Sequence, residues 1–272
     1  MTAKIPTIYL LFISLTAQAG FAEEKLSAEQ AYTLFNQANE AFRTANAATD
    51  DPQKAKKFYE TAILSYEKII NEGQIKNPKL YYNLANAYFL NENLGLAILN
   101  YRRAENLDKD DDNIQKNLAF ARARCIDKVT PKTKKQVLHT LLFWHYDLSL
   151  KTKFLLACLA FAILCISLTV IVWMGQYPSA AAAAVISAII AVCFFASVVA
   201  EAHAQAHTVC GIITADEVVA RQGDGQNYPA SFKDPLHAGT EFNVVEQRPG
   251  WLHIKLADDA DAWVPSSAAG II

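Results

Sequence analysis

The longest apolar stretch of this chain lies between Lys153 and Glu201, and no charged side chain occurs between these two residues. A helix needs roughly 20 apolar residues to cross a hydrocarbon core about 30 Å thick. The stretch is therefore long enough for two crossings and too short for three. Gly175 and Pro178 interrupt it, and both residue types commonly end a helix. The pattern predicts transmembrane helices over residues 154–174 and 180–200.

A chain that crosses a membrane twice returns to the side from which it started. The soluble segments before Lys153 and after Glu201 are therefore expected in one compartment. Both spans are expected to be helical, because backbone groups in lipid must pair within their own segment. The alternative is a buried hairpin of a soluble protein, but soluble helices rarely stay apolar on every face for this length. The second span is rich in alanine, which allows close helix packing in a membrane.

The amino terminus has the order of a secretory signal. Lys4 precedes an apolar core over residues 8–15, and small residues follow at Ala17 and Ala19. This order predicts a signal peptide over residues 1–22, with cleavage after Ala19 or after Ala22.

Lysines upstream of the first span, including Lys151, favour the opposite placement, because lysine and arginine tend to stay on the cytoplasmic side. We give the signal more weight, since long domains are translocated largely regardless of their charge. The soluble parts are therefore expected outside the cytoplasm.

Residues 26–124 have a helical pattern with almost no runs of β-branched residues. A weaker unit that contains an insertion over residues 44–53 comes first, and residues 113–124 are interpreted as a capping helix. The central unit begins at Pro78 and resembles the 34-residue tetratricopeptide repeat (TPR). The resemblance is carried by Tyr81, Leu84, Ala85, Tyr88, Ala97, Tyr101 and Ala104.

The TPR resemblance implies that the concave face of the first helices holds peptides, although a plain solvated face would give the same pattern. Asn39 and Asn83 match asparagines of the TPR clamp for a terminal carboxylate. Phe35 and Asn113 replace the lysines of that clamp, so capture of a terminal carboxylate is not expected. The candidate peptide-binding residues are Asn39, Tyr82, Asn83, Asn86 and Phe89.

Residues 125–153 are interpreted as a linker, with Pro131, followed by an amphipathic helix that lies on the bilayer. Phe143, Trp144 and Tyr146 supply aromatic groups of the kind found at membrane interfaces. His139 and His145 are interpreted as interface residues rather than metal ligands, because no third ligand is near them in the sequence.

Histidines also follow the second span. His203 and His207 are spaced to share one helical face and could hold a metal ion together with Glu201 or Cys210. A polar helix end is the preferred interpretation, since no HExxH motif is present. We predict neither a metal nor a cofactor.

Two of the five cysteines, Cys125 and Cys210, lie outside the apolar spans. They could form a disulfide in an oxidising compartment, and the sequence leaves that pairing open.

Residues 211–272 change to a β pattern, in which Leu252, Ile254 and Leu256 alternate with polar residues. Short strands with turns at this spacing indicate a small antiparallel barrel. This part of the sequence resembles the bacterial SH3 (SH3b) domain. The resemblance is carried by residues 218–225, 237–240, 249–254 and 262–265. A ligand groove could contain Tyr228, Trp251, Trp263 and Pro265, although for Trp263 a place in the barrel core is the preferred interpretation.

The fold class is thus a multi-domain membrane protein with all-α TPR-like repeats, a two-helix transmembrane hairpin and a C-terminal all-β SH3b barrel. This order resembles the BatE-like family of the bacterial aerotolerance (Bat) operons. Residues 113–119, 126–128 and 148–151 strengthen the likeness. The resemblance implies a stress-tolerance role beside a MoxR-type ATPase system and proteins with von Willebrand factor A domains.

Catalysis is not expected, because the sequence has no nucleophile elbow, no phosphate loop and no paired carboxylates in a plausible cleft. A formal charge of −2 makes nucleic acid an unexpected partner. We expect a scaffold in the bacterial inner membrane that binds partner proteins on the periplasmic side. The alternatives are an envelope sensor or anchor whose SH3b domain binds peptidoglycan, and a cytoplasmic adaptor.

Overall fold

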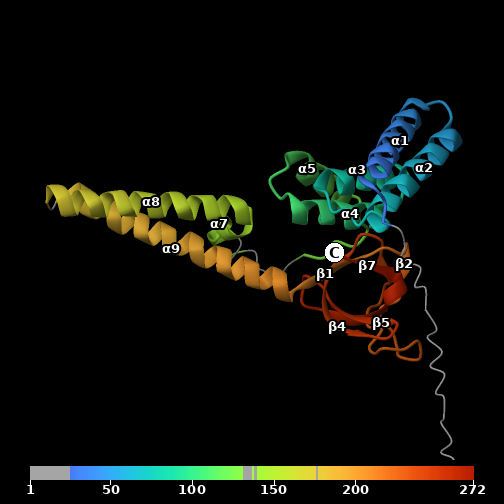
Figure 1. The fold of residues 1–272 in the computed structure, drawn as a ribbon. Coiled ribbons are helices and arrows are strands. Elements are labelled where there is room, and N and C mark those ends of the chain that lie inside the picture. Colours follow the sequence, from blue (N-terminus) through green and yellow to red (C-terminus); the bar gives the residue numbers. More distant parts are fainter. Residues whose placement is uncertain (1–24, 131–136, 138–139, 176) are drawn as a thin grey trace, which may run out of the picture.

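The computed structural model describes residues 25–130, 137, 140–175 and 177–272. It has three parts: a helical array, a long two-helix hairpin and a C-terminal antiparallel sheet (Figure 1). This mixture agrees with the coarse architecture that the hydrophobic pattern predicts. The predicted signal peptide lies outside the described residues, and so do residues 131–136 and 138–139 of the predicted linker and interfacial helix.

Five helices form the array, and their starts are set by side-chain caps. Ser27 and Gln30 form a capping box, and Asn77 and Asp111 accept hydrogen bonds from backbone N–H groups of the helices that follow them. The array consists of α1 (Ala28–Ala47), α2 (Pro52–Asn71), α3 (Pro78–Leu90), α4 (Leu94–Leu107) and α5 (Asp112–Ala123).

Alanines at the helix contacts let neighbouring helices approach closely. Ala38, Ala62, Ala85 and Ala97 are completely buried. Only residues 48–51 of the insertion predicted over residues 44–53 lie between the helices, because α1 continues to Ala47 and α2 begins at Pro52. Its alanines favour helix, so most of the extra residues lengthen the first two helices.

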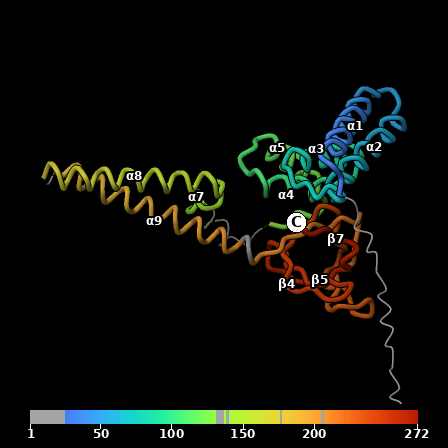
Figure 2. Tube along the Cα trace, in the orientation of Figure 1, coloured from blue at the N-terminus to red at the C-terminus, as the bar shows by residue number. Residues whose placement is uncertain are grey.

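The hairpin consists of α8 (Leu150–Met174) and α9 (Pro178–His207), and it projects away from the other two parts (Figures 1 and 2). Both helices are long and apolar enough to cross a membrane. Only 17% of the most apolar segment of each helix is buried within the protein, whereas the helix of a soluble core would be mostly buried. Ser149 caps α8, and the short α7 (Phe143–Tyr146) precedes it.

The C-terminal part is a five-stranded antiparallel sheet in the order β6-β5-β4-β1-β7, with a separate β2-β3 pair. Leu252, Ile254 and Leu256 are buried, as their alternation predicts. The strands are β1 (Val209–Ile213), β2 (Glu217–Val218), β3 (Leu236–His237), β4 (Glu241–Arg248), β5 (Trp251–Lys255), β6 (Asp261–Pro265) and β7 (Ala269–Ile271).

The sheet begins almost directly where α9 ends, since only Thr208 separates His207 from β1. The array and the sheet also lie against each other, with α4 facing β1 and β7 (Figures 1 and 2). The three parts are therefore connected both along the chain and through space.

Candidate functional site

Four asparagines from the first helices of successive units lie in a row, which we call the carboxamide ladder: Asn39, Asn83, Asn86 and Asn117. In its first step, Asn39 Oδ1 on α1 accepts a hydrogen bond from the Tyr66 hydroxyl at 2.7 Å and one from Asn83 Nδ2 at 3.3 Å. Tyr66 comes from α2 and Asn83 from α3. One carboxamide oxygen thus joins three helices.

The second step of the ladder repeats this arrangement. Asn86 Oδ1 on α3 accepts from the Tyr101 hydroxyl of α4 and from Asn117 Nδ2 of α5 at 2.9 Å. Asn117 Nδ2 also lies 3.0 Å from the Tyr82 hydroxyl oxygen. The two steps therefore have the same pattern, with one tyrosine hydroxyl and one neighbouring carboxamide donating to each central oxygen.

The two tyrosines are well placed to donate at neutral pH. Both are almost completely buried, and burial raises the pKa of Tyr66 to about 12. Burial also raises the pKa of Tyr101. Their hydroxyls stay protonated at neutral pH, so both can donate to the carboxamide oxygens of Asn39 and Asn86.

An aromatic and cationic cluster follows the ladder at the end of α3. The rings of Phe89 and Phe120 lie 5.6 Å apart between centroids. The Arg124 guanidinium lies 4.7 Å from the Phe89 ring and 4.8 Å from the Phe120 ring. Phe120 is 56% exposed, so this cluster is open to solvent.

The structure brings together four of the five candidate peptide-binding residues, namely Asn39, Tyr82, Asn83 and Asn86, and places Phe89 beside them. The sequence reasoning missed Asn117, although a signal for it exists. The triplet Asn-Leu-Ala occurs at residues 83–85 and again at 117–119, at the 34-residue TPR period. Nothing local in the sequence marks Tyr66 and Tyr101 as hydrogen-bond donors to the ladder, because these hydrogen bonds depend on the tertiary fold.

The candidate groove residues on the sheet separate into two groups. Trp251 and Pro265 are cross-strand partners and half-buried, and Tyr228 is 47% exposed. Trp263 is only 8% exposed. The His253 ring stacks on it at 4.7 Å, and the Arg248 guanidinium lies 4.7 Å from it. This placement of Trp263 fits a packing role better than a groove wall.

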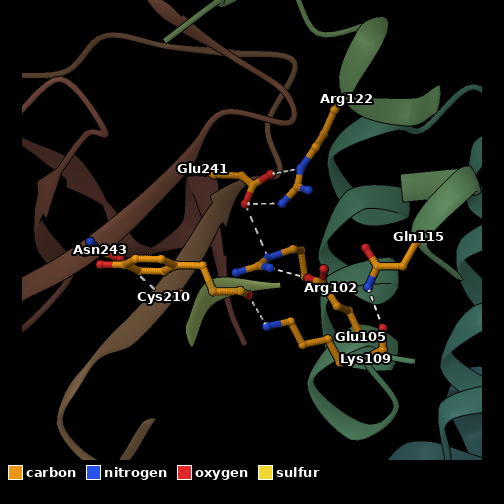
Figure 3. A network of polar contacts seen from close by, with 9 residues as sticks. Arg102, Glu105, Lys109, Gln115, Arg122, Cys210, Glu241 and Asn243 are labelled. Carbon is orange, nitrogen blue, oxygen red and sulfur yellow. Dashed lines mark hydrogen bonds and ion pairs between the residues drawn. The ribbon is translucent and has the colours of Figure 1, made fainter. Parts of the chain in front are cut away.

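Charged side chains join the array to the sheet, as Figure 3 shows. The Glu241 carboxylate lies between two arginines: Arg122 Nη2 donates to it at 3.0 Å, and Arg102 Nε lies 3.3 Å away. Glu105 forms an ion pair with Nη1 of Arg102. We call Arg102, Arg122 and Glu241 the charged junction.

A second polar contact lies at the end of the array. Asp127 accepts hydrogen bonds from the backbone N–H and Nδ1 of His237 at 2.7 and 2.9 Å, and one from the Thr240 hydroxyl. Burial alone would raise the pKa of Asp127, but these hydrogen bonds hold it below the usual range. The carboxylate form is therefore the one that stabilises this contact.

Between these polar contacts the array and the sheet approach each other closely at two glycines. A Cβ atom on Gly95 of α4 would lie 2.7 Å from the Ile213 carbonyl oxygen, and one on Gly270 would lie 2.4 Å from Leu99 Cδ2. Real Cβ contacts are longer than this. At Gly95 the obstacle is backbone, so glycine is required there, whereas at Gly270 the end of the Leu99 side chain would have to shift. Cys125 is buried nearby, with its Sγ 3.7 Å from the Gly239 carbonyl oxygen. Cys125 and Cys210 are both free thiols.

A buried polar cluster closes the base of the hairpin. Lys153 is fully buried and contacts the Glu201 carboxylate and the His145 carbonyl oxygen. His145 Nδ1 lies 2.7 Å from Ser197 Oγ of α9. The two charges that bracket the apolar stretch in the sequence are therefore partners in space.

The other histidines form no metal site in the described parts of the chain, where no group of three or more candidate ligands occurs. His203 and His207 stack on each other at 4.1 Å, and His207 Nδ1 lies 2.8 Å from the His203 carbonyl oxygen. His139 lies outside the described residues.

Comparisons of the chain with protein-family profiles, with curated proteins and with solved structures found no match.

Proposed function

We propose that this chain is a membrane-anchored scaffold that binds segments of partner proteins on the open face of its helical array. The observation that carries this proposal is the carboxamide ladder with the exposed aromatic cluster beside it. Its repeated pattern fits a TPR-like array, and open polar and aromatic groups in a row suit a peptide rather than a small substrate. The hairpin supplies the anchor.

In this proposal the sheet is an SH3b-like domain, and it orients the array rather than acting alone. Polar contacts at Glu241 and Asp127, together with the close approach at Gly95 and Gly270, connect the two parts. The direct passage from α9 into β1 then relates both parts to the membrane. We propose the bacterial inner membrane, with both soluble parts in the periplasm, and a role in a BatE-like complex. Its proposed partners are a MoxR-type ATPase system and von Willebrand factor A domain proteins.

Photo-crosslinking in intact cells tests the binding face. Leu90 is exposed one turn after Asn86, and Leu64 is an exposed leucine on α2. A photoreactive residue in place of Leu90 should give discrete crosslinked products that the same residue at Leu64 does not give. Identical products from both positions, or no product from either, would contradict the proposal.

Alkaline phosphatase fused after Ile272 tests the location, because this enzyme is active only after export. Activity supports the periplasmic placement, and inactivity of a stably expressed fusion would favour the cytoplasmic adaptor. The peptidoglycan alternative predicts that the full chain in detergent co-sediments with cell-wall sacculi. We expect it to stay in solution.

A further inference from the structure

The hydrogen bonds within the carboxamide ladder determine which donors and acceptors of its asparagines remain available to a ligand. The oxygens of Asn39 and Asn86 each accept two hydrogen bonds from the protein. In the part of the chain that the structure describes, no acceptor is found for the Nδ2 group of either residue, and neither group is sealed from solvent. These two amide groups are therefore donors available on the open face.

The paired asparagines offer the complementary group. Asn83 and Asn117 use their Nδ2 atoms within the ladder, which leaves their carboxamide oxygens as acceptors. Each step of the ladder thus presents one donor and one acceptor. This result does not depend on how each amide is oriented, because flipping both members of a pair exchanges their roles and still leaves one of each.

One donor and one acceptor per step complement the C=O and N–H groups of a peptide main chain. An extended segment is favoured, since its main-chain groups are unpaired and can form hydrogen bonds with the ladder. A helical segment would have used the same groups in its own hydrogen bonds.

The charges on this face indicate which peptides fit. Arg43 is exposed one turn beyond Asn39, near enough to affect the Tyr66 hydroxyl electrostatically. Arg124 lies over Phe89 and Phe120. Among the described residues, neither arginine has a carboxylate partner. Arginines readily form bidentate pairs with carboxylates, so the two ends of the ladder favour acidic side chains.

Resting on the proposed function, we infer that the carboxamide ladder binds the main chain of an extended partner segment whose acidic side chains pair with Arg43 and Arg124. This site differs from capture of a chain terminus, because the ladder itself contacts main-chain amides and needs no free carboxyl end.

Peptide binding to the full chain in lipid nanodiscs tests the inference by fluorescence anisotropy. The first probe is a capped peptide of about ten residues with glutamate at alternate positions, which lie on one side of an extended chain. The second has glutamine in place of glutamate, and the third carries N-methyl groups on alternate amides. We expect the first to bind about tenfold more tightly than either of the others, as loss of a charged or hydrogen-bonded contact implies.

Variants locate the binding. Asn86→Asp keeps the oxygen that accepts from Tyr101 and Asn117 and removes the free donor, so it should weaken the glutamine peptide about tenfold. The glutamine peptide is used so that charge repulsion with glutamate is not measured. Asn46→Asp is the matched control, because Asn46 also accepts from a tyrosine hydroxyl, that of Tyr59, at 2.7 Å, but is not part of the ladder. It should bind like the wild type.

Arg124→Gln should reduce binding of the glutamate peptide about fivefold and leave the glutamine peptide unchanged, as expected for one partly exposed ion pair. Equal binding of the N-methylated peptide, or equal effects of Asn86→Asp and Asn46→Asp, would overturn the inference. Crosslinking from Leu90 in cells without binding of these peptides would also overturn it while the proposed function stands. Absence of crosslinking would instead count against the proposed function.

Discussion

The array meets the sheet and the hairpin through two different kinds of surface. Against the sheet, backbone touches backbone at Gly95, Leu99 packs on Gly270, and the charged junction lies beside them. Against the hairpin, the turn between α4 and α5 makes hydrogen bonds. Lys109 Nζ lies 3.5 Å from the Leu148 carbonyl oxygen, and Asp110 accepts a hydrogen bond from the Ser149 hydroxyl at 2.7 Å.

The contact with the sheet is therefore tightly packed, whereas the contact with the hairpin consists of hydrogen bonds that water can replace. A closely packed contact cannot admit an added atom at its tightest point without strain, and its contacts are lost together. Polar contacts with one partner open to solvent can be replaced by water one at a time and contribute little each. We therefore expect the array and the sheet to unfold as one unit, while the array can detach from the base of the hairpin without unfolding.

The largest effect is expected from Gly95→Ala. In a free helix this change would stabilise by about 1 kcal/mol. Here the added Cβ would meet the Ile213 carbonyl oxygen and Thr214 Cα, and such overpacking costs roughly 1–3 kcal/mol. We expect a melting temperature lowered by about 5 °C for the full chain in detergent, followed by tryptophan fluorescence.

Gly225→Ala is the control for this prediction, because its Cβ would lie at an ordinary 3.5 Å from the Tyr228 ring. It should change the melting temperature little. A higher melting temperature for Gly95→Ala would show that α4 does not pack on β1.

The second effect in size is expected from Glu241→Gln, which leaves Arg102 and Arg122 without their shared carboxylate. Hydrogen bonds to charged groups contribute about 1.5–3 kcal/mol, and the partial exposure of this site reduces that range. We expect about 1 kcal/mol lower stability in guanidinium unfolding. Glu246→Gln removes a carboxylate paired with Arg248 on the sheet surface and should have a smaller effect. Equal effects would mean that the charged junction does not join the two parts.

The sequence alone predicted the hairpin because an uninterrupted apolar stretch needs no tertiary information to recognise. It placed the helix ends less well. The first span was predicted from Phe154, but α8 begins at Leu150 behind the Ser149 cap, and α9 continues to His207. Charged and polar residues end an apolar stretch without ending a helix. Hydropathy therefore marks the lipid boundary rather than the helix boundary.

The contact between array and sheet could not be predicted in the same way. In the sequence, Gly95 is only a weak helix former that follows Leu94. Nothing near it in the sequence shows that the lack of a side chain at this position allows β1 to approach α4. Arg122 and Glu241 are far apart in the sequence, and nothing in the sequence distinguishes either of them from an ordinary charged surface residue. The ladder was partly predicted, since its asparagines follow the repeat, whereas their hydrogen bonds to buried tyrosines depend on the folded array.

A smaller effect is expected from pH. The pKa of Asp127 is lowered in the folded chain, so its carboxylate contributes stability above the unfolded value of about 4, and this contribution is lost as the pH falls further. We expect the melting temperature to decrease between pH 5 and pH 3 less steeply in Asp127→Asn than in the wild type. Asp261→Asn changes an exposed aspartate that also contacts a histidine, His253, and should keep the wild-type slope. Identical slopes for Asp127→Asn and the wild type would contradict the role given to Asp127.

The smallest effect is expected from Asp110→Asn at the base of the hairpin. Asp110 accepts hydrogen bonds from the hydroxyls of Ser149 at 2.7 Å and Thr152 at 3.3 Å. Ser149 is buried, but Asp110 is open to solvent, and contacts of a solvated carboxylate contribute less than about 1 kcal/mol, so the melting temperature should stay the same. Hydrogen exchange should become faster in α7 and the first turn of α8. Asp112→Asn alters an exposed carboxylate that is paired with Lys116 and should leave exchange there unchanged. An equal decrease in melting temperature for Asp110→Asn and Gly95→Ala would contradict the comparison. Loss of one polar contact with the hairpin would then destabilise the array as much as disruption of its contact with the sheet.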